Sequence, residues 1–165
     1  MRKLALAILL VPFTIGCTTM SNNNDKNVEL IGKYVQAVES MDYDAMDLYL
    51  ADNYLGMGPS YGDSIGKVAA IENWKYNVEN LYERIKYNKS RIVPVTISTG
   101  ENQGEWVSNW AELDITYKNG QGEVTIWANA IYLIENGKIV KSITFYNEAD
   151  ALRQMGYVFI NPNDL

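Results

Sequence analysis

The spacing of apolar residues predicts helices in the first half of the chain. Apolar side chains recur every three or four positions over residues 27–41, which predicts an amphipathic helix with one buried face. A second, short helix is expected to begin after Asp42, whose side chain can cap it. The clearest apolar stripe runs over residues 67–85 and predicts a third helix. Between these helices, residues 56–62 hold three glycines and a proline, so we expect a turn-rich loop there.

The second half of the chain has the pattern of strands. It is rich in β-branched and aromatic residues, separated by short turns that contain glycine. The strand-like runs are residues 91–99, 105–117, 123–134 and 139–147. Residues 148–155 then have the pattern of a short closing helix, which Gly156 can end. Three helices followed by an antiparallel meander predict an α+β fold in which the sheet curls around the helices.

The N-terminal segment is typical of an export signal. Residues 1–16 have a basic start and an apolar run that is shorter than the roughly 20 residues a spanning helix needs. The only cysteine, Cys17, follows directly, and the residues before it resemble the lipobox of bacterial lipoproteins, which implies lipidation of Cys17. An incidental cysteine after a plain signal peptide is the alternative. We expect a lipoprotein signal peptide over 1–16, a lipidated cysteine and flexible tether over 17–26, and one domain over 27–165.

Composition narrows the chemistry open to this domain. The 165-residue chain has no histidine and one cysteine. This excludes a histidine general base, a Ser-His-Asp triad, a CxxC pair and a zinc site of His or Cys. The net charge of −6 at pH 7, with no basic run, makes nucleic acid and anionic headgroups poor partners. We therefore expect no metal, no cofactor and no nucleic-acid partner, with membrane contact only through the lipid.

Several short motifs, taken in order, resemble nuclear-transport-factor-2-like (SnoaL-like) domains. They are residues 34–45, 50–53, 59, 66–74, 135–140 and 152–156. The resemblance covers about residues 28–156 and implies a cone-shaped α+β barrel, with three N-terminal helices packed in the concavity of a curled antiparallel sheet. This family includes isomerases, cyclases, dehydratases, epoxide hydrolases and non-catalytic binders. The resemblance therefore implies a fold and leaves the activity open.

The catalytic positions implied by the resemblance mostly lack catalytic groups. The ketosteroid-isomerase pattern puts an oxyanion-binding tyrosine at Tyr34, but its base falls on Gly58 and its second oxyanion donor on Ala130. Many SnoaL-like relatives carry an aspartate where this chain has Asn147, an amide that cannot act as a base. The epoxide-hydrolase pattern needs an Asp–Arg–Asp cluster, and no arginine here is flanked by acids in the matching strands. Since losing one oxyanion donor costs roughly two orders of magnitude in rate, we do not expect these reactions.

The same register predicts an apolar pocket. The inward positions on three strands are Ala111, Leu113, Ile115, Ala128, Ala130, Tyr132, Ser142, Thr144 and Tyr146. Tyr34, Tyr54, Met57 and Trp74 are expected to close the wall and the mouth. Such a lining suits a small, largely uncharged, apolar ligand. The alternative is that these side chains simply fill the core.

The opposite strand faces carry tryptophans and carboxylates. The outward positions are expected to form an exposed apolar patch larger than monomeric proteins usually carry; its residues are Trp106, Trp110 and Trp127. Since relatives often dimerise through this convex face, we expect a homodimer there. A bulge of one residue would instead turn Glu112 and Asp114 into the pocket, where two carboxylates sharing a proton could act as acid and base. Glu112, Asp114 and Tyr34 are the candidate catalytic residues.

Two functions follow from these observations. The first is a lipid-anchored domain of the bacterial cell envelope, facing the periplasm or in the outer membrane, that binds a small apolar molecule without catalysis. The second is a lyase or isomerase, resembling cyclases or dehydratases, that uses Glu112 and Asp114 or the pocket tyrosines. An interaction module with a filled pocket is a weaker third. A carboxylate with a raised pKa inside the largest cavity would favour the enzyme.

Overall fold

The computed structural model describes residues 18–164, so Cys17 and the signal-like segment lie outside the described residues. Within this range the α-helices are α1 (Thr18–Glu39), α2 (Tyr43–Tyr49), α3 (Lys67–Asn80) and α4 (Glu148–Gln154). The strands are β1 (Leu50–Met57), β2 (Ser64–Gly66), β3 (Tyr82–Ile97), β4 (Gly104–Tyr117), β5 (Gly122–Glu135) and β6 (Lys138–Tyr146). Two short 3-10 helices are η1 (Lys118–Gly120) and η2 (Pro162–Asp164). No helix in this part of the chain is long and apolar enough to cross a membrane.

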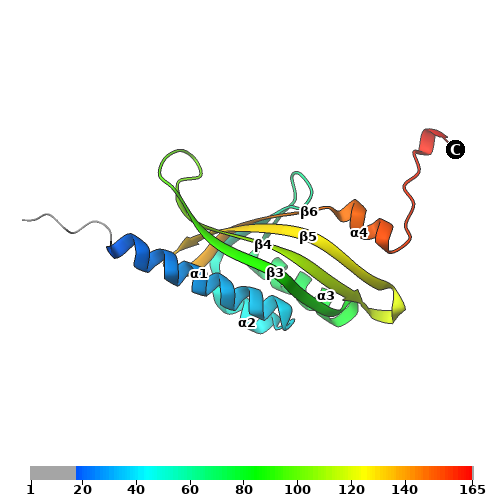
Figure 1. Cartoon of the computed structure of the whole chain (residues 1–165), viewed down its shortest axis with the longest axis horizontal. Helices are drawn as coiled ribbons and strands as arrows, with labels where there is room; N and C mark the ends of the chain where they lie inside the picture. Colours follow the sequence, from blue (N-terminus) through cyan, green and yellow to red (C-terminus); the bar gives the residue numbers. More distant parts are fainter. Residues whose placement is uncertain (1–17, 165) are drawn as a thin grey trace, which may run out of the picture.

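One curled, unclosed sheet forms the frame of the molecule. Its strand order is β2-β1-β6-β5-β4-β3, and β3 to β6 pair antiparallel with their sequence neighbours. Helices α1, α2 and α3 lie along one face of this sheet, and α4 packs against β5 (Figure 1). This is the α+β cone that the sequence predicts. The expectation of a wholly antiparallel sheet is wrong, because β1 runs parallel to β6 and the sheet is mixed.

The core lies between α1 and the concave face of the sheet. Ile31, Val35 and Val38 follow one another at helical spacing and are buried against the sheet, where they join Val107 and Ile139. Burying each such side chain stabilises the fold by about 1.5–3 kcal/mol. The apolar stripe that predicts this helix is therefore the surface that holds α1 in the concavity.

Helix α1 begins at Thr18, whereas the apolar pattern predicts a start at residue 27. The polar residues 18–26 continue the helix instead of forming an irregular segment. Their pattern could not reveal this, because an exposed helical turn has no apolar stripe, and Asp25 and Lys26 are exposed. Among the side chains described from residue 23 onward, the first buried one is that of Asn27, whose Nδ2 donates to Glu105 Oε2 on β4 at 2.9 Å.

Two strands, β1 and β2, were not predicted, and the boundary between α3 and β3 differs from the expected one. Strand β1 has no clean alternation because its exposed positions are adjacent, as at Asp52 and Asn53. Helix α3 ends at Asn80 rather than near Ile85, and β3 begins at Tyr82. Ile85 fits the helical stripe, but it is buried on the inner face of β3.

The register of β4, β5 and β6 places inward-facing side chains in rows across the sheet. The rows are Val107–Tyr132–Ser142, Asn109–Ala130–Thr144 and Ala111–Ala128–Tyr146. Because side chains alternate between the two faces of a strand, the residues between these rows point to the outer face. The alternation in these three strands thus decides which residues can line an internal site.

Candidate ligand-binding cavity

A cavity of about 460 Å³ lies between the concave face of the sheet and helices α1, α3 and α4. This volume is in the range of small-molecule sites. The inward-facing side chains of β4, β5 and β6 form its floor, while α1 contributes Tyr34 and α3 contributes Trp74. These side chains enclose space that they do not fill. A cavity of this size favours a pocket over a wholly packed core.

Eight of the nine residues predicted to bind a ligand line this cavity. They are Tyr34, Tyr54, Trp74, Leu113, Ala130, Tyr132, Thr144 and Tyr146. Met57 is not part of the lining. Leu50, Tyr54 and Gly56 are the buried positions of β1, so by alternation Met57 lies on the other face of that strand. Ligand binding by the other eight stays a prediction.

One wall of the cavity is fixed by a buried hydrogen bond. The Tyr54 hydroxyl and Ser142 Oγ are 2.6 Å apart, and both residues are less than a tenth exposed. Gly56 makes room for this contact, because a Cβ at that position would lie 2.7 Å from the Tyr54 hydroxyl oxygen. The bond joins β1 to β6 across their parallel pairing.

Two tyrosine hydroxyls at the inner end of the cavity have no protein partner among the described residues. Tyr34 and Tyr132 pack edge to face with ring centroids 5.7 Å apart, and neither is more than 7% exposed. Every fully buried polar side-chain atom in residues 18–164 has a partner, so these two hydroxyls border the open cavity. Burial, followed by the neighbouring tyrosines, raises the pKa of both well above 10. They are therefore protonated at neutral pH and can donate hydrogen bonds.

Three tyrosines and one carboxylate form the outer end of the cavity, which we call the mouth: Tyr82, Tyr117, Tyr146 and Glu148. The rings of Tyr82 and Tyr117 have centroids 5.6 Å apart. Burial raises the pKa of Tyr82 to about 12, and it also raises the pKa of Tyr117 and Tyr146. Glu148 contributes to each of these three shifts. The negative charge of Glu148 therefore affects the electrostatic potential at all three tyrosines of the mouth.

Charged groups are scarce along the cavity. No lysine or arginine of the described residues lines it, and the carboxylate of Glu148 at the exposed rim is the one acidic group of its described lining. Nor do residues 18–164 bring together three or more Asp, Glu, His or Cys side chains that could hold a metal ion. The inner cavity consists of aromatic rings, aliphatic groups, hydroxyls and the amide of Asn109.

The candidate acid/base pair Glu112 and Asp114 lies outside the cavity, on the outer face of β4. Glu112 forms an ion pair with Lys89 at 2.7 Å. Asp114 accepts hydrogen bonds from Thr125 Oγ1 at 2.8 Å and from Asn88 Nδ2 at 2.6 Å. These hydrogen bonds lower the pKa of Asp114. The shifted register that would bring both carboxylates into the pocket does not occur, because β4 pairs with β5 without a bulge.

The structure shows what Gly58, Ala130 and Asn147 do at the three positions where the resemblance implies a catalytic group. Gly58 has a φ of +84°, and a Cβ there would collide with the backbone oxygen of Thr144. Ala130 presents a methyl group to the cavity. Asn147 caps α4, since its Oδ1 accepts from the backbone N–H of Asp150 at 3.0 Å. An acid or base at position 58 would require a different loop.

Several lining residues were not predicted from the sequence. They include Leu81, Tyr82, Tyr87, Glu148, Leu152 and Met155. The first three lie at or after the end of α3, where the helical stripe was extended too far. The other three lie on or just after α4, whose short pattern indicates a helix but not the surface on which it packs. A shorter third helix would have put Tyr82 and Tyr87 on β3. Alternation would still have placed them on opposite faces, and both line the cavity because the pairing of β3 with β4 shifts register between Tyr82 and Arg84.

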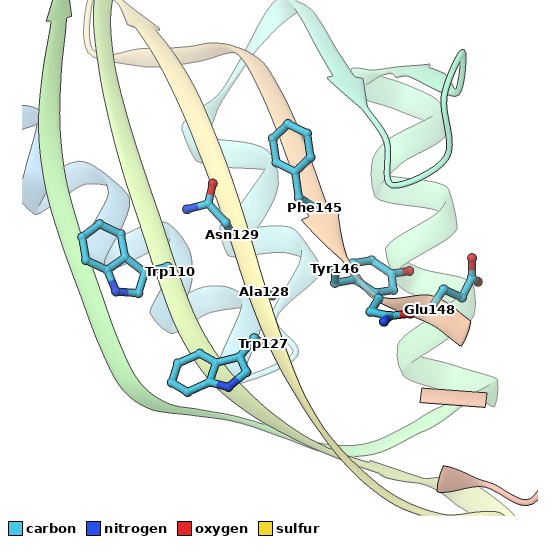
Figure 2. A pocket seen from close by; sticks show the side chains of 8 residues that line it. Trp110, Trp127, Ala128, Asn129, Phe145, Tyr146 and Glu148 are labelled. Atoms are coloured by element: carbon cyan, nitrogen blue, oxygen red, sulfur yellow. The ribbon is translucent and has the colours of Figure 1, made fainter. Parts of the chain in front are cut away.

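The outer face of the sheet carries a shallow groove, whose lining shares Ala128, Tyr146 and Glu148 with that of the cavity. Figure 2 shows Trp110 and Trp127 on neighbouring strands and Phe145 on β6. Trp110 is 42%, Trp127 61% and Phe145 53% exposed. Trp106 was expected in the same row, but it is only 5% exposed and its Nε1 donates to the Asn102 carbonyl at 2.8 Å. The exposed aromatic face therefore consists of Trp110, Trp127 and Phe145.

Comparison with known proteins identifies the fold. The sequence matches no protein-family model and no curated protein. A proposed polyketide cyclase from Xanthomonas campestris pv. campestris has a TM-score of 0.67 at 19% identity, over 81% of this chain and 98% of that one. A proposed isomerase from Bacillus subtilis has a TM-score of 0.61 at 15% identity, over 83% and 97% of the two chains.

A third similar structure is an LEH-like epoxide hydrolase from Mycobacterium tuberculosis. Its TM-score is 0.60 at 12% identity, over 81% of this chain and 86% of that one. At these identities the likeness shows the fold alone. This chain has the cone-shaped α+β fold shared by SnoaL-like and nuclear-transport-factor-2-like proteins.

Proposed function

We propose that this protein binds a small, largely apolar molecule in its internal cavity and does so without catalysing a reaction. The observation that carries this proposal is the cavity of about 460 Å³, whose inner part has apolar walls and hydroxyl groups but no charged group. Apolar pockets with a few polar groups are the usual form of small-molecule sites. The unpartnered hydroxyls of Tyr34 and Tyr132 would orient such a ligand by donating to its oxygen or nitrogen atoms.

The geometry favours binding over the alternative of a lyase or isomerase. Such an enzyme needs a base near the bound substrate. Glu112 and Asp114 point away from the cavity, and Gly58, Ala130 and Asn147 supply no base. The one carboxylate of the described lining, Glu148, lies at the exposed rim, away from the inner cavity. Since the pKa of Tyr34 and of Tyr132 lies well above 10, these phenols hold their protons at neutral pH. They suit the role of hydrogen-bond donors.

Binding of an apolar probe tests the proposal. We expect tert-butylbenzene to bind the wild-type domain with one site per chain, measured by calorimetry. Ala130→Leu, which fills the cavity from β5, should weaken this binding at least tenfold. Ala69→Leu makes the same change at an exposed position of α3 and should leave it unchanged. If the wild type binds no apolar probe, or if both variants bind as the wild type does, the proposal is wrong.

The natural ligand can be sought by exposing the protein to cell extract. Wild-type domain and Ala130→Leu are each incubated with a total lipid extract, repurified and analysed by mass spectrometry. A compound retained by the wild type and lost from the variant would be a candidate ligand. Equal retention by both would place the compound outside the cavity.

We propose further that the domain is anchored to a membrane through a lipid on Cys17. The support is the sequence alone: a basic start, an apolar run over residues 4–15 and the single cysteine at the lipobox position. Metabolic labelling with a radioactive fatty acid should label the wild type and not Cys17→Ser. Label on the serine variant would contradict the proposal.

We propose that the exposed aromatic face of Trp110, Trp127 and Phe145 mediates a homodimer. Three large exposed rings on adjacent strands form a patch of the kind that marks an interface. Sedimentation velocity at micromolar concentration should give a dimer for the wild type and a monomer for Trp127→Lys. Tyr61→Lys, in the exposed loop between β1 and β2, serves as the control and should remain dimeric. A monomeric wild type would contradict the proposal.

A further inference from the structure

The mouth of the cavity combines aromatic rings with a single negative charge. The ring centroids of Tyr82 and Tyr117 are 5.6 Å apart, and those of Trp74 and Tyr82 are 6.2 Å apart. Tyr146 and Glu148 complete the mouth and are its most exposed members. All of these aromatic side chains line the same cavity.

This combination favours a positively charged group. The face of an aromatic ring carries negative partial charge and attracts a cation within about 6 Å of its centroid. Glu148 adds a formal negative charge at the same rim. No lysine or arginine among the described residues lines the cavity to compete for these groups. The net charge of −6 adds long-range attraction for cations.

We propose that the ligand is an organic cation, with an ammonium group held in the mouth by Tyr82, Tyr117, Tyr146 and Glu148 and an apolar body in the inner cavity. This inference rests on the proposed function, because it names the chemical class of ligand for the same cavity. An alkylated ammonium fits the mouth because its methyl groups bury against rings while its charge faces their π electrons. An anionic ligand would meet Glu148 and no cation.

The effect of Glu148 on the neighbouring phenols is consistent with this assignment. Glu148 raises the pKa of Tyr82, Tyr117 and Tyr146, after the larger effect of burial on each. A potential that opposes the formation of a phenolate stabilises a cation at the same place. The three tyrosine rings and the Glu148 carboxylate would therefore all stabilise a cation bound in the mouth.

The test compares two probes of the same shape that differ in charge. Phenyltrimethylammonium and tert-butylbenzene have nearly identical volumes, and only the first is a cation. We expect phenyltrimethylammonium to bind the wild type about tenfold more tightly, which is within the measured range of cation–π interactions. Raising the salt concentration should weaken its binding and leave that of tert-butylbenzene unchanged.

Variants of the mouth separate the charge from the rings. Glu148→Gln should weaken phenyltrimethylammonium severalfold without affecting tert-butylbenzene, whereas Glu135→Gln, at the far end of β5, should change neither. Tyr146→Phe keeps the aromatic ring and should retain cation binding. Tyr146→Leu removes the ring and should lose most of the preference for the cation. A cooperative urea unfolding transition like that of the wild type shows that each variant is folded.

The outcomes distinguish this inference from the proposed function. If tert-butylbenzene binds as tightly as phenyltrimethylammonium, or more tightly, the organic-cation inference is wrong and the apolar-binding function stands. If neither probe binds, both are wrong. If Glu148→Gln and Glu135→Gln weaken the cation equally, the effect is one of net charge, and the assignment to the mouth is overturned.

Discussion

Gly58 links the backbone of the β1–β2 loop to the absence of a side chain at position 58. Its φ of +84° is a conformation that residues with a side chain rarely adopt, and the backbone oxygen of Thr144 occupies the place a Cβ would need. The conformation of the loop therefore requires glycine at position 58. The ketosteroid-isomerase pattern described above implies a base at the same position. The difference from that pattern thus involves the backbone as well as one side chain.

Substitution of Gly58 tests how tightly the loop is packed on β6. Gly58→Ala should lower the free energy of unfolding by about 2–3 kcal/mol, because it combines a left-handed φ with a collision. Gly62→Ala is the control, since Gly62 has a φ of +91° with open space around it, and it should cost about 1–2 kcal/mol. Urea unfolding measures both. Equal losses would mean that the contact with Thr144 is unimportant.

The buried pair Tyr54–Ser142 should contribute measurably to stability. Tyr54→Phe leaves Ser142 Oγ without a partner, and we expect a loss of about 1–2 kcal/mol. Ser142→Ala should cost a similar amount. The double variant should cost less than the sum of the two, by about 1 kcal/mol, because the second change removes the group that the first leaves unsatisfied. Strict additivity in urea unfolding would show that the two groups do not interact.

At the scale of elements, α4 is held at its start by Asn147. The helix has only seven residues and is too short to be stable alone. Asn147→Ala should cost about 1 kcal/mol of unfolding free energy, whereas Asn147→Asp should cost little because aspartate caps equally well. The binding of tert-butylbenzene should weaken in the first variant, since Ala151 and Leu152 of α4 line the cavity. Equal effects of the two substitutions would argue against a capping role.

The sequence predicted the regular elements better than the irregular ones. Strands β4, β5 and β6 have long alternating patterns, and their predicted bounds differ from the observed ones by one residue at most ends. Strand β1 was missed because Asp52 and Asn53 are both exposed and break the alternation. The predicted third helix includes the first four residues of β3, 82–85, because Ile85 fits both the helical and the strand period. The spacing of apolar residues alone could not distinguish a helix from a strand over residues 82–85, because either element would bury Ile85.

Over the whole molecule, the cavity could be predicted where it is built by the central strands. Ala130, Tyr132 and Thr144 followed from alternation and from the register implied by the family resemblance. Tyr82 and Tyr117, which face each other in the mouth, depend on where β3 begins and how far the sheet curls. Those are tertiary properties, so the aromatic mouth could be recognised only in the structure.

The buried tyrosines should make the protein sensitive to alkaline pH. The pKa of Tyr34 and of Tyr132 is raised well above 10, and that of Tyr82 to about 12. Above pH 10 the unfolded chain loses phenolic protons that the folded chain keeps, so the unfolded state binds fewer protons. The free energy of unfolding should then fall with rising pH, by up to about 1.4 kcal/mol per pH unit for each such tyrosine.

Urea unfolding at pH 9, 10.5 and 11.5 measures this fall. Tyr132→Phe removes one of the buried phenols and should reduce the slope by the contribution of one tyrosine. A free energy of unfolding at pH 11.5 equal to that at pH 9 would contradict the assignment. An unchanged slope in Tyr132→Phe would exclude this residue as a contributor.

The direction in which α1 runs has a consequence for how a ligand would reach the site. Asn27, near the start of α1, bonds to Glu105 at the beginning of β4, whereas Tyr117 of the mouth ends that strand. Glu105 and Tyr117 lie about 40 Å apart along the strand. Figure 1 shows the start of α1 and helix α4 at opposite ends of the molecule. With a lipid on Cys17, the opening would face away from the bilayer. The ligand would then enter and leave the cavity from the aqueous compartment. A molecule dissolved in the membrane would have to leave the membrane before it could bind.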